Sequence, residues 1–145
     1  MIKRYLAVAM LFAALGMVAY TATAAPDAAR GAVEQLKTAV QHSGFSQNYD
    51  NMQTAKQHLQ HVVNCIEGQR GPMYDGGAGN PCEGKGNGAM GDAKAAGGKL
   101  TAAATWLDLA NDIAVTGIKA KDIKKVKAAG WATQAVLEHA AKEVR

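Results

Sequence analysis

The chain has 145 residues, which suits a single domain. Hydrophobic residues make up 48% of the chain, and many of them are alanine. Aromatic residues make up only 6% of the chain, and this composition favours closely packed helices over β-strands. The formal net charge of +4 falls to +2 if Lys3 and Arg4 are removed with an N-terminal signal, so charge gives no argument for nucleic-acid binding.

Residues 1–24 have the features of a secretory signal peptide. Lys3 and Arg4 form a positive n-region, and the apolar run from Tyr5 to Tyr20 is too short for a membrane span. Ala22-Thr23-Ala24 fits the small-x-small cleavage rule. We therefore expect a mature helical domain over 25–145, without a transmembrane anchor, in the periplasm of a Gram-negative bacterium or secreted from it.

Four segments carry apolar residues at alternating spacings of three and four, the period of an amphipathic helix. They cover about 27–43, 47–66, 92–116 and 120–144. Short first and third connections favour antiparallel neighbours, so the sequence predicts an all-α, up-down-up-down four-helix bundle.

Local signals place the ends of these helices. We expect a turn at Ser43–Ser46 with Ser46 as the next N-cap, Asp92 as the N-cap of the third helix and Gly117 as its end. Trp106 and Trp131 lie at similar distances from Gly117, where they could meet across the third and fourth helices.

A glycine-rich stretch, Glu67–Gly91, separates the second and third predicted helices and has no apolar periodicity. Cys65 and Cys82 are the two cysteines of the chain, so in an oxidising compartment one internal pairing exists. This disulfide would close a loop worth roughly 3 kcal/mol in the loop-entropy treatment. The sequence thus predicts a long loop stapled to the end of the second helix.

His58, His61 and Cys65 lie on one face of the second predicted helix, three and four residues apart. Two imidazoles so placed can chelate a metal ion, with copper or zinc as the suited metals and Glu83 as a further ligand from the loop. A reduced Cys65 would add a thiolate, whereas an oxidised one would not. The other donors available in the loop are Asp75, Asn80, Met73 and Met90.

Two alternatives stay open for these histidines, partly exposed polar residues at the loop contact or haem ligands. Covalent haem is excluded because the chain has no Cys-x-x-Cys-His motif. His42 falls some ten residues from His58 in the predicted hairpin register, which is too far to share an ion, and His139 should lie on the surface.

Other patterns give little chemistry. Gly84–Gly88 lacks the preceding strand and the Gly-Lys-Ser/Thr ending of a phosphate-binding loop. No nucleophile, base and acid can be brought together, so we expect a non-enzymatic protein.

Lysines gather around the start of the fourth predicted helix, where they oppose the helix dipole. They are Lys119, Lys121, Lys124, Lys125 and Lys127. We select Lys121, Lys124 and Lys125 as candidate contacts to an acidic envelope protein or anionic surface, with a solvated face as the alternative.

The run from His58 to Cys65, followed by Asn80-Pro81-Cys82-x-Gly84-x-Gly86-Asn87-Gly88-Ala89, resembles small exported proteobacterial proteins without an assigned function. The resemblance covers about a quarter of the mature chain. It implies that the histidines, cysteines and loop glycines form one unit, and it implies no activity or ligand.

Overall fold

The computed structural model describes residues 24–144, so the predicted signal peptide lies almost wholly outside the described residues. Regular structure in this part of the chain is entirely helical: α1 (Ala24–Asn48), α2 (Met52–Glu67), the 3-10 turn η1 (Gly76–Ala78), α3 (Ala89–Ala96), α4 (Lys99–Lys119) and α5 (Ile123–Glu143). The all-α prediction is confirmed, with five α-helices in this region in place of four.

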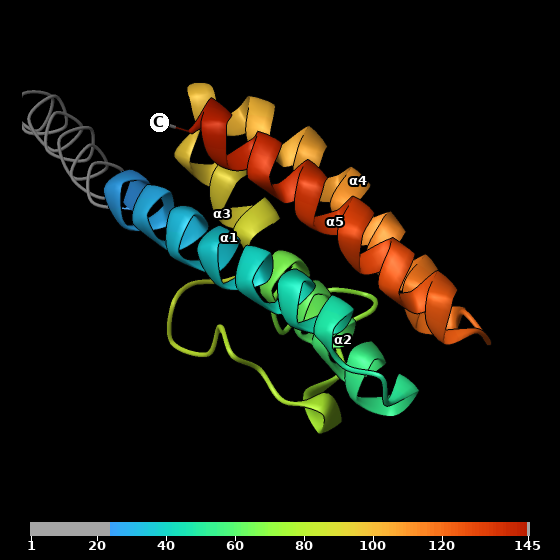
Figure 1. Cartoon of the computed structure of the whole chain (residues 1–145). Helices are drawn as coiled ribbons and strands as arrows, with labels where there is room; N and C mark the ends of the chain where they lie inside the picture. The colour runs from blue at the N-terminus through green and yellow to red at the C-terminus, as the bar shows by residue number, and fades with distance from the viewer. Residues whose placement is uncertain (1–23, 145) are drawn as a thin grey trace, which may run out of the picture.

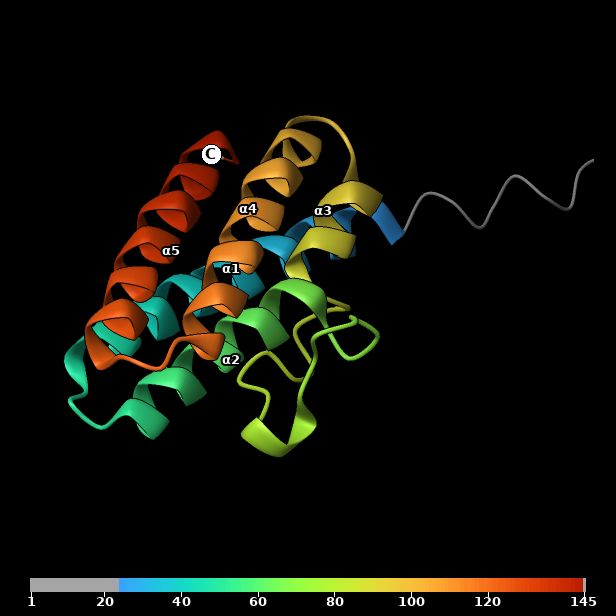
Figure 2. The same ribbon diagram turned by 90° about the vertical axis from the view of Figure 1, so that its right-hand side faces the viewer.

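The four long helices lie as two adjacent pairs. Helices α4 and α5 run side by side, and α1 lies along α2, as both views show (Figures 1 and 2). Helix α3 packs against α1 and α4. The long connection between α2 and α3 lies at the edge of the molecule, outside the helices (Figure 1).

Helix α1 continues through the segment where a turn was predicted, and the predicted N-cap at Ser46 is wrong. The Ser43 hydroxyl donates to the Val40 carbonyl and the Ser46 hydroxyl donates to the Ser43 carbonyl, each at 2.7 Å. Both serines therefore bond to the backbone of α1 itself. Ser46 is buried where Gly130 of α5 packs against it. The second helix instead starts after Asn51, whose Oδ1 accepts from the Thr54 N–H at 3.0 Å.

The predicted third helix is two helices, because Gly97 and Gly98 have φ of +72° and +58° and end α3. Asp92 is not an N-cap. It lies within α3, buried, and its carboxylate accepts from Gln35 Nε2 at 2.7 Å and from the Asn87 N–H at 2.9 Å. Gly117 does not end α4 either, because it is a packing position where a Cβ would lie 2.6 Å from Leu59 Cδ1.

The core follows the predicted apolar stripes closely in α2, α4 and α5. The buried members of those stripes are Ala55, Leu59, Val62, Ile66, Ala103, Leu107, Ala110, Ala114, Val126, Leu137 and Ala140. Trp106 packs against the His139 ring at 4.2 Å between centroids, whereas Trp131 is 67% exposed. None of the described helices combines the length and hydropathy needed to cross a membrane.

Candidate metal centre

Three histidines from two helices converge at the α1–α2 interface. His42 comes from α1, and His58 and His61 come from α2. The Nδ1 atom of His42 lies 3.1 Å from the Nδ1 of His58 and 3.1 Å from the Nδ1 of His61. One nitrogen from each ring lies within 4.8 Å of the others. A tetrahedral ion with Zn–N bonds of about 2.0–2.1 Å separates its ligand nitrogens by about 3.3 Å, so the spacing suits a transition metal.

The hydrogen bond of His61 fixes which of its nitrogens is free. Its Nε2–H donates to the Ala78 carbonyl at 2.7 Å, so the Nδ1 of the neutral ring carries a lone pair. If the Nδ1 of His42 carries a hydrogen, that N–H can donate to the Nδ1 of His58 or to that of His61, but not to both. The Nδ1 that receives no hydrogen bond then faces His42 without a good partner. A metal ion that accepts all three lone pairs removes this conflict.

The pocket favours the neutral form of two of these histidines, His42 and His58. Burial, followed by the charges of His61, His58 and Lys85, lowers the pKa of His42 from 6.5 to about 4. Burial and then the charge of His61 also lower the pKa of His58. Metal ligation requires the neutral imidazole, so these two rings are ready to bind an ion at neutral pH.

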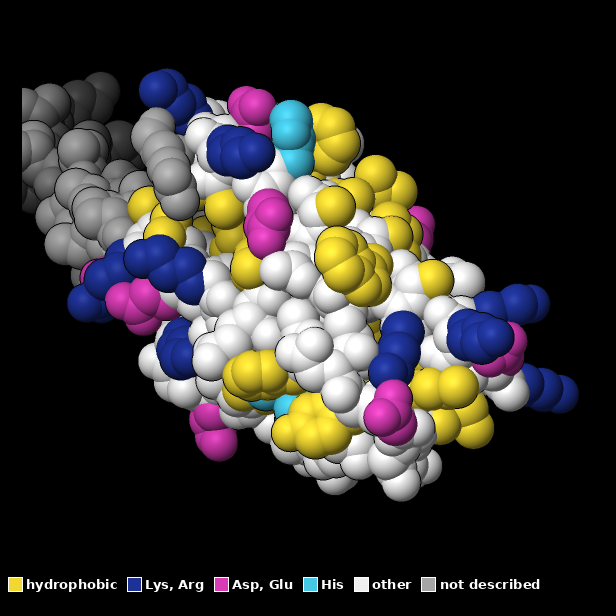
Figure 3. Space-filling model, in the orientation of Figure 1, with side chains coloured by type: hydrophobic (Ala, Val, Ile, Leu, Met, Phe, Trp, Pro, Cys, Tyr) yellow, Lys and Arg dark blue, Asp and Glu magenta, His cyan; other side chains and the backbone are white. Residues whose placement is uncertain are grey.

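Aromatic side chains near the end of α1 cover one side of the histidine group. Phe45 packs edge-on against His42 and His58, with centroids 5.4 and 5.3 Å away. Tyr49 stacks on His58 at 5.1 Å and is 44% exposed. In Figure 3 a small area of histidine surface shows between two hydrophobic side chains, as expected for half-buried rings.

The predicted disulfide is confirmed, since Cys65 and Cys82 are bonded and both are buried. The buried Asn64 fixes the loop beside it: its Nδ2 donates to the Asp75 and Gly79 carbonyls at 2.7 Å each, and its Oδ1 accepts from the Asp75 N–H at 3.0 Å. The disulfide and the hydrogen bonds of Asn64 therefore both hold the loop on α2.

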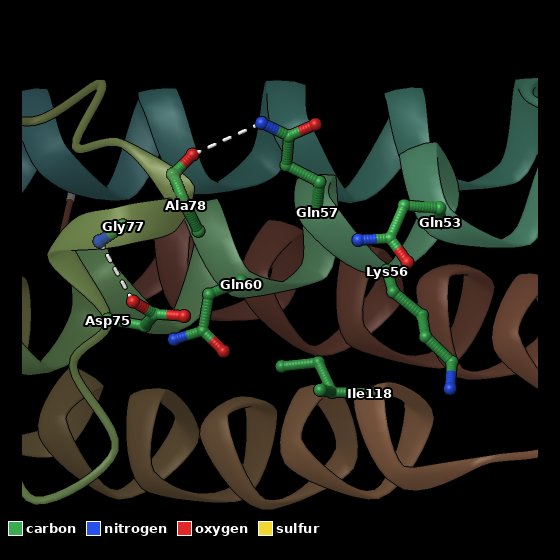
Figure 4. A pocket seen from close by; sticks show the side chains of 8 residues that line it. All are labelled: Gln53, Lys56, Gln57, Gln60, Asp75, Gly77, Ala78 and Ile118. Carbon is green, nitrogen blue, oxygen red and sulfur yellow. Dashed lines mark hydrogen bonds between the residues drawn. The ribbon is translucent and has the colours of Figure 1, made fainter.

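The loop reaches the histidines through the carbonyl of Ala78, at the end of η1. This oxygen accepts from His61 Nε2 and also from Gln57 Nε2 at 3.2 Å, so its position is set from two sides. Figure 4 shows the bond from Gln57. Metal-bound histidines in proteins commonly donate their second N–H to a carbonyl in this way. The same turn borders a cavity of about 370 Å³ along the glutamines of α2, shown in Figure 4.

The structure brings together His58 and His61 as predicted, but not the predicted loop ligand. Glu83 is exposed, lies beside Cys82 and is not a member of the three-histidine group. Cys65 is in the disulfide and offers no thiolate. The other loop candidates are engaged elsewhere or packed: Asp75 caps η1, Asn80 accepts from the Cys82 N–H, Met73 is 41% exposed and Met90 packs against the core.

The prediction that His42 is too far from His58 was wrong, and the misplaced turn is the reason. With α1 ending at Asn48 and α2 starting at Met52, the two histidines lie at matching heights on either side of the turn. The polar run Asn48–Asn51 was the signal that could have placed this turn. His139 is exposed as predicted, beside Trp106 and outside the group.

The three lysines selected from the sequence, Lys121, Lys124 and Lys125, are all exposed. They flank the connection between α4 and α5. Comparisons of the chain with family models, with curated proteins and with solved structures gave no match.

Proposed function

We propose that this protein is an exported, non-enzymatic helical protein that binds one transition-metal ion, copper or zinc, through His42, His58 and His61. The observation that carries the proposal is the convergence of three Nδ1 atoms from two helices. Imidazole is a good ligand for both metals, and copper(II) generally binds the tighter of the two. In this view the long helices form an up-down-up-down bundle that serves as the scaffold.

Export is supported by the signal-like N-terminus and by the disulfide, since disulfides persist in oxidising compartments. Haem is a poor fit because His42 lies within hydrogen-bond distance of both His58 and His61, which leaves no room for a macrocycle between the rings. A binding role in place of catalysis is supported by the lack of a nucleophile with its base in the sequence pattern.

Metal titration of single variants tests the proposal. Purified protein is titrated with Cu²⁺ and with Zn²⁺ in competition with a chromophoric chelator, beside His42→Ala, His58→Ala, His61→Ala and the control His139→Ala. We expect one equivalent of metal to bind, a loss of more than about tenfold in affinity for each of the three variants, and wild-type affinity for the control.

Circular dichroism of each variant checks that the helices remain folded. Equal affinity in all four variants would show that the ion binds elsewhere or nonspecifically. Wild-type affinity in His42→Ala alone would reduce the site to the two histidines of α2 and contradict the three-ligand proposal.

A further inference from the structure

Two of the short connections between the helices lie at one end of the molecule. The α1–α2 turn and the α4–α5 connection are neighbours in both ribbon views (Figures 1 and 2). Lys127 Nζ holds them together through a contact of 2.7 Å with Asp50 Oδ1. We call this region the connection end.

The connection end carries a concentration of positive charge that helix stability does not explain. Four exposed lysines lie in the last turn of α4, in the connection after it and at the beginning of α5: Lys119, Lys121, Lys124 and Lys125. Those at the start of α5 face the positive end of its dipole, which is unfavourable. The one carboxylate within this stretch, Asp122, caps α5 by accepting from the Lys124 N–H at 2.8 Å.

Exposed apolar side chains lie beside this charge. Five large hydrophobic residues are exposed in the described chain, and three of them belong here: Tyr49 at 44%, Met52 at 40% and Trp131 at 67%. Trp131 lies one turn after Lys127 and almost one turn before Gln134, which bonds Gln47 of α1. It therefore emerges on the face of α5 that adjoins the end of α1. Figure 3 shows hydrophobic and lysine side chains together on this part of the surface.

We propose that the connection end docks on the surface of an anionic phospholipid membrane. Tryptophan and tyrosine favour the membrane–water interface, and lysines near an anionic membrane add electrostatic attraction. Protein–protein interfaces are instead depleted in lysine and enriched in arginine, and the four exposed positive residues here are all lysine. The composition thus favours lipid over an acidic protein.

Vesicle binding tests this proposal on the purified protein. Sedimentation with vesicles of phosphatidylglycerol and phosphatidylcholine is compared with vesicles of phosphatidylcholine alone, at low and at high salt. The test variants are Trp131→Ala and the triple variant Lys121→Glu/Lys124→Glu/Lys125→Glu. The control is Lys37→Glu/Lys94→Glu/Lys142→Glu, which makes the same charge change at exposed lysines elsewhere.

We expect binding to the anionic vesicles only, a loss of about tenfold or more in the test triple variant, and a smaller loss in the control. In a Trp106→Phe background, the fluorescence of Trp131 should shift to the blue on binding. Binding to polyglutamate but not to vesicles would assign the surface to an acidic protein partner instead.

Equal losses in the two triple variants, or no binding to anionic vesicles at low salt, would overturn the proposal. A dimer in sedimentation velocity that Trp131→Ala dissociates would assign the surface to a second copy of the chain. Trp131 is largely exposed, so its replacement leaves the fold intact even if the triple variant is destabilised.

Discussion

The Nδ1 atoms of His42 and His58 lie 3.1 Å apart, on two helices that meet at a tight turn. At this distance, protonation of both rings to the imidazolium form would place two positive charges in contact inside a half-buried pocket. The contact is therefore compatible with neutral rings or with a shared metal ion, and both conditions disappear in acid.

The metal-free protein should become less stable as the pH is lowered, over a range set by the pKa of His42. Its pKa is lowered to about 4 in the folded protein from 6.5. Between these values the unfolded chain binds more protons, so the contribution of the neutral ring is complete above pH 6.5 and is lost as the pH falls towards 4. Urea midpoints across this range should fall less steeply for His42→Gln than for the wild type.

The pH region above this range provides the control. Between about pH 7 and 8 the urea midpoints of the wild type and of His42→Gln should change in parallel, because His42 is then mostly neutral in both the folded and the unfolded chain. Identical slopes for the wild type and His42→Gln between pH 6.5 and about 4 would contradict the assignment of that range to His42.

Asn64 should link the loop to the metal affinity. Replacement by alanine removes the hydrogen bonds to Asp75 and Gly79 and leaves buried groups without partners, which costs about 1–3 kcal/mol. The Ala78 carbonyl beside His61 would lose its fixed position, and affinity for Zn²⁺ should fall about tenfold. Chelator competition measures this, with the exposed Asn48→Ala as the control. Unchanged affinity in Asn64→Ala would show that loop position is irrelevant to the ion.

Removal of the disulfide should cost more stability than affinity for metal. The Cys65→Ser/Cys82→Ser variant loses a bond between residues 17 positions apart, for which about 3 kcal/mol of unfolding free energy is expected. The hydrogen bonds of Asn64 still hold the loop near His61, so Zn²⁺ binding should weaken by less than in Asn64→Ala. Urea unfolding and chelator competition on the same samples test this order. The opposite order would make the covalent bond the main positioning element.

Two glycines should respond in opposite directions to alanine. A Cβ at Gly31 in α1 would lie 2.8 Å from the Lys85 carbonyl oxygen and 2.9 Å from Asp92 Oδ2, so Gly31→Ala should destabilise the protein by about 1–3 kcal/mol. Gly91 lies in α3 with open space around it, and Gly91→Ala should stabilise by up to about 1 kcal/mol. Thermal unfolding of both variants measures the contrast. A stabilising Gly31→Ala would mean that the loop does not close on α1 as described.

The sequence supported the helical class and most of the core because those depend on periodicity. Leu59, Val62 and Ile66 repeat at helical spacing, and burying such a stripe is the dominant gain in folding. The disulfide was equally predictable, because two cysteines allow a single pairing.

The third histidine could not be predicted without the correct turn. Ser43 and Ser46 are common in turns, yet here their hydroxyls bond to carbonyls of α1 and the helix continues. Tertiary packing of Ser46 beneath Gly130 decides this, and that contact joins segments far apart in the chain. An error in one turn shifted the register and separated His42 from its partners.

Buried polar groups were the other part that the pattern missed. Gln35, Asn64 and Asp92 are polar, so the apolar pattern did not predict that they belong to the core. Each of them is almost completely buried. Their partners are mainly backbone groups of the glycine-rich loop, which has no periodicity of its own. The need for them becomes visible only when the loop is placed against the helices.

The loop begins and ends at the same point in space. A Cβ at Gly68 would lie 2.7 Å from the Gly88 nitrogen, and a Cβ at Gly88 would lie 2.7 Å from the Gly68 nitrogen, so the two backbones cross in contact. The segment between Gly68 and Gly88 therefore leaves the helical domain and returns to it at the same place, so a change in its length need not move α2 relative to α3. A longer loop that keeps Cys82 and the backbone groups bonded to Gln35, Asn64 and Asp92 should therefore leave the scaffold that presents His42 and His58 in place.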